Sequence, residues 1–135
     1  DYLSDLVEAQ NDYVKPSRTK AEILQQNKAK GRAFEKQEFA KFSAKYNNAA
    51  EQVTIKTPSG TRTRVDAIGL DADGKIVIYE FKSSLTAPLT KNQRVAFEEI
   101  LKSGGVVVGK GEGKGIFKGG KLIEAGTEVK IIRPN

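Results

Sequence analysis

Apolar and polar residues alternate along two neighbouring stretches in the middle of the chain, residues 64–70 and 76–82. Side chains point to opposite faces in turn along a β-strand. Each stretch therefore predicts a strand with one mainly apolar face, and polar groups stand at the far end of that face. The residues that share it are Asp66, Ile68 and Leu70 on the first strand, and Ile76, Ile78, Glu80 and Lys82 on the second.

The residues between the two strands decide which side chains meet. Ala72-Asp73-Gly74 fits a three-residue hairpin loop, which places a left-handed residue, usually glycine, at its third position. Such a loop sets Asp66 opposite Glu80, with Cβ atoms roughly 4.5–5.5 Å apart. The pairs above it are Asp71–Lys75, Leu70–Ile76 and Ile68–Ile78. A two-residue turn would shift the register by one and separate the two acids to opposite faces.

The remaining pattern predicts helices and strands on both sides of this hairpin. Capping-box sequences open helices near Lys20 and at Thr90. We expect the first helix to break at Gly31 and resume through 32–46, and the second to reach about Lys102. Further strands are expected at 51–57, 106–108 and 128–133. This order predicts a single α/β (α+β) domain, in which a mixed, twisted sheet is flanked by helices.

Charge is unevenly distributed along the 135 residues, which carry a formal net charge of +6. Residues 1–14 contain four acidic and no basic residues, whereas the rest of the chain is basic. We therefore interpret 1–18 as an acidic N-terminal segment or linker and 19–135 as the functional domain. The basic domain favours a polyanionic partner.

Several residue types are missing, and their absence excludes classes of chemistry. The chain has no cysteine and no histidine, which rules out disulfides, thiolate zinc sites and every mechanism that uses imidazole. A metal would have only oxygen ligands, which suits Mg²⁺ or Mn²⁺ and tolerates Zn²⁺. No apolar run reaches membrane-spanning length. Methionine is absent too, so we expect the chain to be a fragment or a processed product.

Asp66, Glu80 and Lys82 are the candidate catalytic residues. Two opposed carboxylates repel each other unless a cation lies between them. A divalent ion held there activates water and neutralises charge on a phosphate, and a lysine one pleat away stabilises the phosphate oxygens. This is the equipment for phosphodiester hydrolysis.

Glu35 is a further candidate because it falls in the middle of the apolar face of its helix. That face is defined by Phe34, Phe39, Phe42 and Tyr46. A buried, unpaired carboxylate is costly. The sequence leaves two explanations open: Glu35 pairs with a basic residue in the core, or it points into the metal site.

The ordered set Asp66, Glu80-Phe81-Lys82 resembles the motif of the PD-(D/E)xK nuclease superfamily, although the proline before the first acid is missing. The resemblance implies that Asp66, Glu80 and Glu35 are metal ligands and that Lys82 positions or activates the attacking water. Gln93 resembles a glutamine that some branches carry on the following helix. Polar residues around the motif are expected to contact nucleic acid: Ser83, Ser84, Thr86, Lys91, Gln93 and Arg64.

A closer resemblance covers roughly residues 31–133. The stretches 31–35, 53–60, 82–84, 87–93 and 104–111 are similar to C-terminal toxin domains of bacterial contact-dependent growth inhibition and related polymorphic toxins. This resemblance implies a nuclease carried at the end of a larger secreted or surface-presented protein. It also implies action in the cytoplasm of a target cell and neutralisation at home by an immunity protein.

Three functions stay open at this point: a metal-dependent DNase toxin, the same site cutting tRNA, and a basic nucleic-acid-binding module without catalysis. For the immunity protein, the glycine-rich stretch around Gly109–Lys121 is expected to form a mobile hairpin with an exposed edge to which a partner adds strands. The active-site cleft is the alternative surface.

Overall fold

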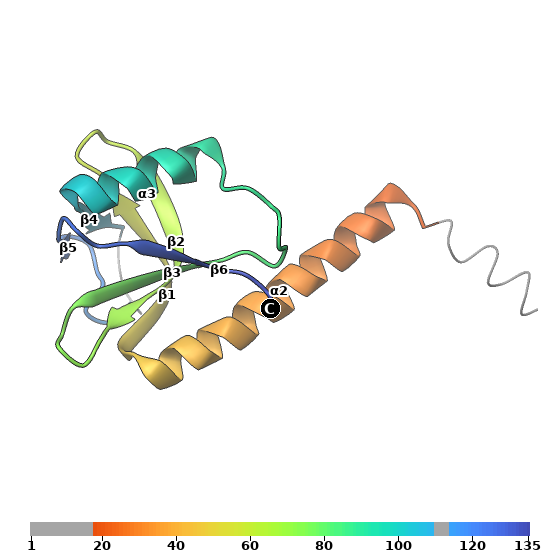
Figure 1. Ribbon diagram of the computed structural model, residues 1–135, viewed down its shortest axis with the longest axis horizontal. Coiled ribbons are helices and arrows are strands. Elements are labelled where there is room, and N and C mark those ends of the chain that lie inside the picture. Colours follow the sequence, from red (N-terminus) through yellow and green to blue (C-terminus); the bar gives the residue numbers. More distant parts are fainter. Residues whose placement is uncertain (1–17, 110–113) are drawn as a thin grey trace, which may run out of the picture. The chain divides into compact units, whose positions relative to one another are not determined.

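A computed structural model describes residues 18–109 and 114–135, so residues 1–17 of the predicted N-terminal segment 1–18 lie outside the described residues (Figure 1). The chain divides into two compact units, residues 1–32 and 33–135. Helix α2, Lys20–Lys45, carries the chain from one unit into the next. The division thus falls inside a helix.

Helix α2 begins where the sequence predicted. The hydroxyl of Thr19 accepts a hydrogen bond from the backbone N–H of Glu22 at 3.1 Å, which satisfies one of the unpaired donors of the first turn. The predicted break at Gly31 is wrong, because the helix is continuous through that residue. A glycine costs a helix only about 1 kcal/mol. In the first unit, the large apolar residues of α2, Ile23 and Leu24, are exposed.

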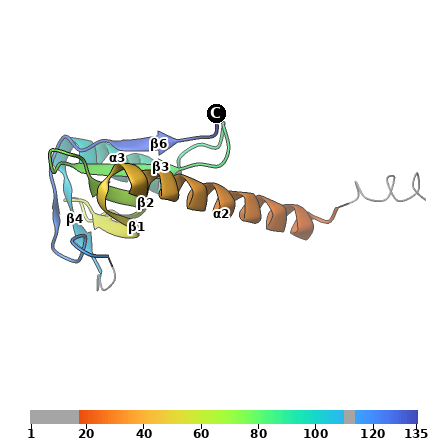
Figure 2. The same cartoon turned by 90° about the horizontal axis from the view of Figure 1, so that it is seen from below.

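The second unit has an α+β fold, built on a curled, mixed sheet of six strands (Figures 1 and 2). Its strands run in the spatial order β5-β4-β1-β2-β3-β6. All neighbouring pairs are antiparallel except β3 and β6, which are parallel and are connected through helix α3 and strands β4 and β5. The bounds are β1 Asn47–Lys56, β2 Arg62–Leu70, β3 Ile76–Phe81, α3 Lys91–Ser103, β4 Gly105–Val108, β5 Leu122–Ile123 and β6 Val129–Ile132.

The β2–β3 hairpin has the loop and register that the sequence predicted. Asp71 and Lys75 are joined by a backbone hydrogen bond of 2.8 Å, and Gly74 has a φ of 79°. The left-handed region is reached easily by glycine alone. The expected pairs Leu70–Ile76 and Ile68–Ile78 are both formed. The three-residue loop is therefore confirmed.

Two apolar clusters lie on the two faces of the sheet. One includes Ala96, Phe97 and Ile100 of α3, packed with strand residues such as Ile68 and Ile78. The other joins Phe42 of α2 to Ala67 and Phe81, with Phe34, Phe39, Tyr46 and Tyr79 beside them. The predicted apolar face of the first helix is therefore confirmed as a packing surface.

Helix α3 is fixed at both ends by interactions that the sequence indicated. Thr90 and Gln93 form both hydrogen bonds of a capping box. Gly104 ends the helix with a φ of 75°, and a Cβ there would lie 2.2 Å from the carbonyl oxygen of Ile123. Only glycine fits this position.

The glycine-rich stretch is better integrated than predicted. Phe117 is fully buried in the cluster beneath α3. Val107 of β4 donates to the carbonyl of Lys121 and accepts from the N–H of Gly120. The N–H of Gly120 and the carbonyl of Lys121 are therefore already paired within the chain, whereas the hypothesis of an exposed edge required them to be free. Residues 110–113 of this stretch lie outside the described residues.

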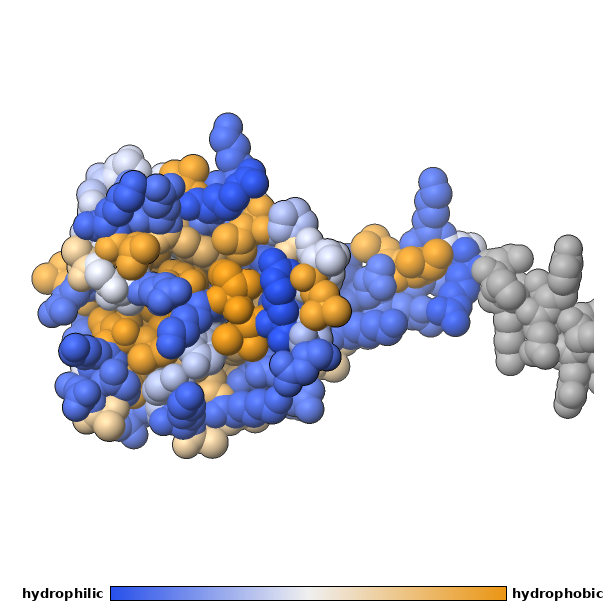
Figure 3. Space-filling view, in the orientation of Figure 1, coloured by the Kyte–Doolittle hydropathy of each residue, from blue (hydrophilic) through white to orange (hydrophobic). Residues whose placement is uncertain are grey.

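The surface of the second unit carries scattered large apolar side chains. Those that are most exposed are Leu122 and Leu85, at 71% and 65%, and Figure 3 shows apolar residues interspersed with hydrophilic ones on one face. Neither of the helices in the described part of the chain is sufficiently long and apolar to cross a membrane.

Candidate active site

The candidate site forms where β2 and β3 separate. β2 and β3 pair as far as Ala67 and Tyr79, whereas the pairing of β3 with β6 on its other edge continues through Glu80, opposite Ile131, to Phe81. Asp66 lies one residue beyond the last pair, so its backbone has no pairing partner on β3 among the described residues. Its carboxylate fills the gap, and its Oδ2 accepts a hydrogen bond of 2.8 Å from the backbone N–H of Phe81.

Gln52 of β1 holds the other oxygen of Asp66. Its side-chain amide donates to Asp66 Oδ1 at 3.1 Å. Gln52 lies between Glu51 and Val53, whose partners on β2 are Ala67 and Val65, so it stands opposite Asp66. Its φ is 55°, a left-handed conformation that costs a residue with a Cβ roughly 1–2 kcal/mol. Sequence reasoning missed Gln52, because no local pattern signals this conformation.

Glu80 is the most buried charged side chain in the described part of the chain, with 5% of its surface exposed. Its Oε2 accepts a hydrogen bond of 2.8 Å from the side-chain amide of Gln93. Its Oε1 is buried and has no hydrogen-bond partner among the described residues. Burial, reinforced by the negative charge of Asp66 and opposed by Lys82, raises the pKa of Glu80 to about 8.

Gln93 is hydrogen-bonded both to Glu80, a candidate metal ligand, and to Lys82, the lysine predicted to position or activate the attacking water. Its Oε1 accepts from Lys82 Nζ at 3.0 Å, while its Nε2 donates to Glu80. The same Oε1 also accepts from the backbone N–H of Thr90, as part of the capping box. The start of α3 thus fixes both Glu80 and Lys82. Gln93, suggested only by resemblance, lies at the centre of the site.

Glu35 lies near this group without bonding to it. The side chain is half-buried on α2. Burial raises the pKa of Glu35, the charges of Asp66 and Glu51 add to this effect, and Arg64 opposes it. Neither of the two salt bridges found among the described residues involves Glu35. Among the described residues Glu35 therefore has neither a basic partner in the core nor a direct hydrogen bond to Glu80.

A divalent cation fits two of the three predicted carboxylates. The unpaired Glu80 Oε1 and the neighbouring Asp66 are oxygen donors of the kind that Mg²⁺ and Mn²⁺ prefer. In residues 18–109 and 114–135, no three acidic side chains are grouped closely enough to hold an ion together. A metal ion would therefore be held by Asp66 and Glu80, and the predicted role of Glu35 as a third ligand remains a prediction.

The polar residues predicted to contact nucleic acid occupy several positions around the site. Ser84 Oγ accepts from the backbone N–H groups of Thr86 and Ala87 at 3.2 Å, so it stabilises the turn after β3. Ser83 and Thr86 are exposed in that loop, Lys91 is exposed at the first residue of α3, and Arg64 is exposed on β2.

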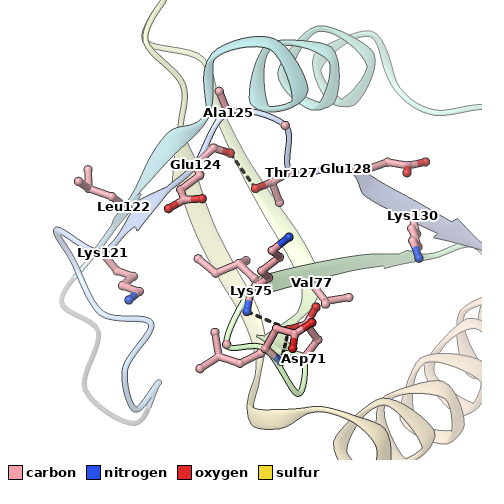
Figure 4. A pocket seen from close by; sticks show the side chains of 15 residues that line it. Asp71, Lys75, Val77, Lys121, Leu122, Glu124, Ala125, Thr127, Glu128 and Lys130 are labelled. Atoms are coloured by element: carbon pink, nitrogen blue, oxygen red, sulfur yellow. Dashed lines mark hydrogen bonds between the residues drawn. The ribbon is translucent and has the colours of Figure 1, made fainter.

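A separate cavity of about 690 Å³ opens at the other end of the β2–β3 hairpin. Figure 4 shows that its walls come from the hairpin loop, with Asp71 and Lys75, from the segment between β5 and β6, with Glu124, and from Lys130 of β6. None of the candidate catalytic residues lines it.

Comparison of this chain with models of protein families, with curated proteins and with solved structures finds no match.

Proposed function

We propose that this chain is a metal-dependent nuclease that hydrolyses phosphodiester bonds in DNA. The observation that carries the proposal is the environment of Glu80: a buried carboxylate with one unpaired oxygen, beside Asp66 and linked through Gln93 to Lys82. A buried polar atom without a partner costs the fold about 1–3 kcal/mol. A cation bound at Glu80 Oε1 in the working enzyme would offset that cost.

The topology supports the same proposal. A helix, three antiparallel strands, a second helix and a strand parallel to β3 occur in this order, with β4 and β5 before the last strand. The order is compatible with the resemblance to PD-(D/E)xK nucleases, and it brings Asp66, Glu80 and Lys82 to one end of the β2–β3 pair.

The residues divide the work of phosphodiester hydrolysis among them. When bound, a divalent ion supplies Lewis-acid chemistry, lowering the pKa of water and neutralising phosphate charge. Asp66 and Glu80 would hold it, and the hydrogen bonds from Gln52 and the Phe81 N–H fix the orientation of Asp66. Lys82 provides an ammonium group that stabilises negative oxygens in the transition state. Gln93 keeps that ammonium group beside Glu80.

The biological setting follows from the resemblance in sequence. We infer a toxin domain at the end of a larger secreted or surface-presented protein, acting in the cytoplasm of a target cell and blocked at home by an immunity protein. The net charge of +6 suits a nucleic-acid substrate.

The test is cleavage of plasmid DNA and, separately, of total tRNA by the purified chain with Mg²⁺, Mn²⁺, Zn²⁺ or EDTA. We expect metal-dependent loss of plasmid that EDTA abolishes and that Glu80→Ala lacks. Glu98→Ala is the matched control, because Glu98 is an exposed acid paired with Lys102 on the outside of α3. It should cut like the wild type.

Three results would change the proposal. Loss of tRNA alone would keep the mechanism and change the substrate. Metal-dependent cleavage by both Asp66→Ala and Glu80→Ala would place the site elsewhere. No cleavage with any metal would leave a nucleic-acid-binding module.

A further inference from the structure

Three basic residues share the outer face of β1 and β2. Lys56 pairs with Arg62 across the two strands, and Arg64 follows two residues along β2, opposite Thr54. The intervening side chains, Ile55, Thr63 and Val65, are buried on the opposite face. Since neighbours along a strand point to opposite sides, Lys56, Arg62 and Arg64 point outward together. We call these three residues the basic row.

The basic row is electrostatically unfavourable for the isolated chain. Like charges that stand directly opposite each other on two strands destabilise the pair. The salt bridges found within residues 18–109 and 114–135 join Lys41 to Glu38 and Lys102 to Glu98, both within helices. Neither neutralises the Lys56–Arg62 pair. An anion bound across both residues would remove the repulsion.

The face that carries the basic row is accessible. Arg62 and Arg64 are exposed, and β4 extends the same face with Val106 beside Lys56 and Val108 beside Thr54. Neither valine belongs to the cluster that α2 covers, which contains Ala67, Val77 and Phe81 instead. Cations beside small aliphatic side chains, without aromatic rings, suit a phosphate backbone better than stacked bases.

The basic row also leads to the candidate site. Arg62, Arg64 and Asp66 follow one another along β2, and four residues of β-strand span about 13 Å. Asp66 lies where the strand changes face, because Val65 and Ile68 both belong to the cluster with α3 whereas Ala67 belongs to the cluster with α2. Along β1 the same direction runs from Lys56 to Gln52, which bonds to Asp66. A nucleic-acid strand that follows the row therefore reaches Asp66.

We propose that the basic row binds the phosphate backbone of the substrate and guides one strand across the outer face of β1 and β2 to Asp66. This inference rests on the proposed function. It assigns Lys56 and Arg62 as substrate-binding residues. DNA and RNA present the same phosphates, so the row contributes affinity without base preference.

Binding can be measured apart from cleavage. Fluorescence anisotropy in EDTA, with labelled single-stranded DNA, duplex DNA and RNA of one sequence, compares the wild type with Lys56→Gln/Arg62→Gln. We expect about tenfold weaker binding of the nucleic acid that the enzyme cuts. The slope of log affinity against log salt should fall by about 1.4 on a single strand, because two phosphate contacts are lost. The melting temperature should stay the same or rise, because the opposed cations are gone.

The matched control is Lys75→Gln/Lys121→Gln, which removes the same charge from two exposed lysines near the cavity at the other end of the hairpin. Its affinity should change less than twofold. Equal losses in both double variants, no loss in the Lys56/Arg62 variant, or no binding by the wild type would each overturn the inference. Competition by polyglutamate as effective as that by the oligonucleotide would also overturn it, in favour of an acidic protein partner.

The two proposals fail in different ways. Suppose that the wild type cleaves nucleic acid and the Lys56/Arg62 variant binds and cleaves normally. This result would reject the role of the basic row and leave the proposed nuclease activity intact. A wild type that binds through the row but cuts nothing with any metal retains the surface and rejects the nuclease.

Discussion

The two ends of the β2–β3 hairpin differ in how completely their polar groups are satisfied. At the loop end, Asp71 Oδ1 accepts from the backbone N–H groups of Asp73 and Lys75 at 2.9 Å, and glycine supplies the left-handed residue. At the other end the pairing of β2 with β3 stops, Gln52 adopts a strained conformation, and Glu80 has a buried oxygen without a hydrogen-bond partner in the part of the chain that the structure describes. Strain and unmet polar groups that persist in a fold point to function. The loop end serves folding, and the opposite end is the candidate for chemistry.

The largest expected contrast is between the two aspartates, Asp66 and Asp71. Asp66→Asn should reduce the rate of metal-dependent DNA cleavage by about 10²–10³-fold, because a metal-binding charge is lost. Asp71→Ala should leave that rate unchanged while lowering the free energy of unfolding by about 1–2 kcal/mol, because two N–H groups lose their acceptor. Steady-state cleavage rates and urea unfolding measure both. Equal loss of activity in the two variants would erase the distinction.

A second contrast concerns pH. The pKa of Glu80 is raised from 4.5 to about 8 in the folded chain, so the folded state binds more protons than the unfolded state between these values. The stability of the metal-free protein should therefore be highest below about pH 4.5, as far as Glu80 contributes, and fall as pH rises towards 8. Thermal unfolding in EDTA from pH 5 to 8 measures the slope.

Glu80→Gln is the control for that slope, because it keeps the shape of the side chain and removes the titration. It should flatten the dependence, leaving the smaller contribution of Glu35, whose pKa is also raised. An unchanged slope in Glu80→Gln would show that Glu80 is already ionised at neutral pH.

Gln93 offers a change that acts on folding and on the site together. Gln93→Ala removes the reciprocal bond of the capping box and the links to Glu80 and Lys82. The free energy of unfolding should fall by about 1 kcal/mol. The cleavage rate of Gln93→Ala should also fall, because Glu80 and Lys82 lose their common partner. Gln93→Glu restores the capping bond alone. It should recover part of the stability but not the cleavage rate, because a carboxylate cannot donate a hydrogen bond to Glu80. Recovery of both would make Gln93 a capping residue only.

The smallest expected effect on stability comes from Gln52, and its sign is informative. Gln52→Gly should raise the free energy of unfolding by up to about 1 kcal/mol, since glycine adopts a positive φ without strain. The same change removes the hydrogen bond to Asp66 and should lower the cleavage rate. Gln52→Asn tolerates the conformation with a shorter amide and separates the two effects. If Gln52→Gly is more stable and cleaves as fast as the wild type, the strained conformation of Gln52 does not contribute to catalysis.

The sequence by itself determined the features that depend on neighbouring residues. Alternation and the loop residues Ala72-Asp73-Gly74 set the register of β2 and β3, and Thr90 with Gln93 set the start of α3. They also put Asp66, Glu80 and Lys82 near one end of the hairpin. These patterns work because turn geometry and capping involve residues only a few positions apart.

Tertiary structure decided the features that depend on residues far apart in the chain. The pairing of β2 with β3 ends at Ala67 and Tyr79, and beyond it the Asp66 carboxylate accepts from the N–H of Phe81. Packing placed Phe117 in the core. A bond across two strands tied Gln52 to Asp66, and enclosure by the sheet and α3 left Glu80 buried with an unpaired oxygen. Local sequence does not specify these contacts, because burial and strain arise only when distant segments pack together.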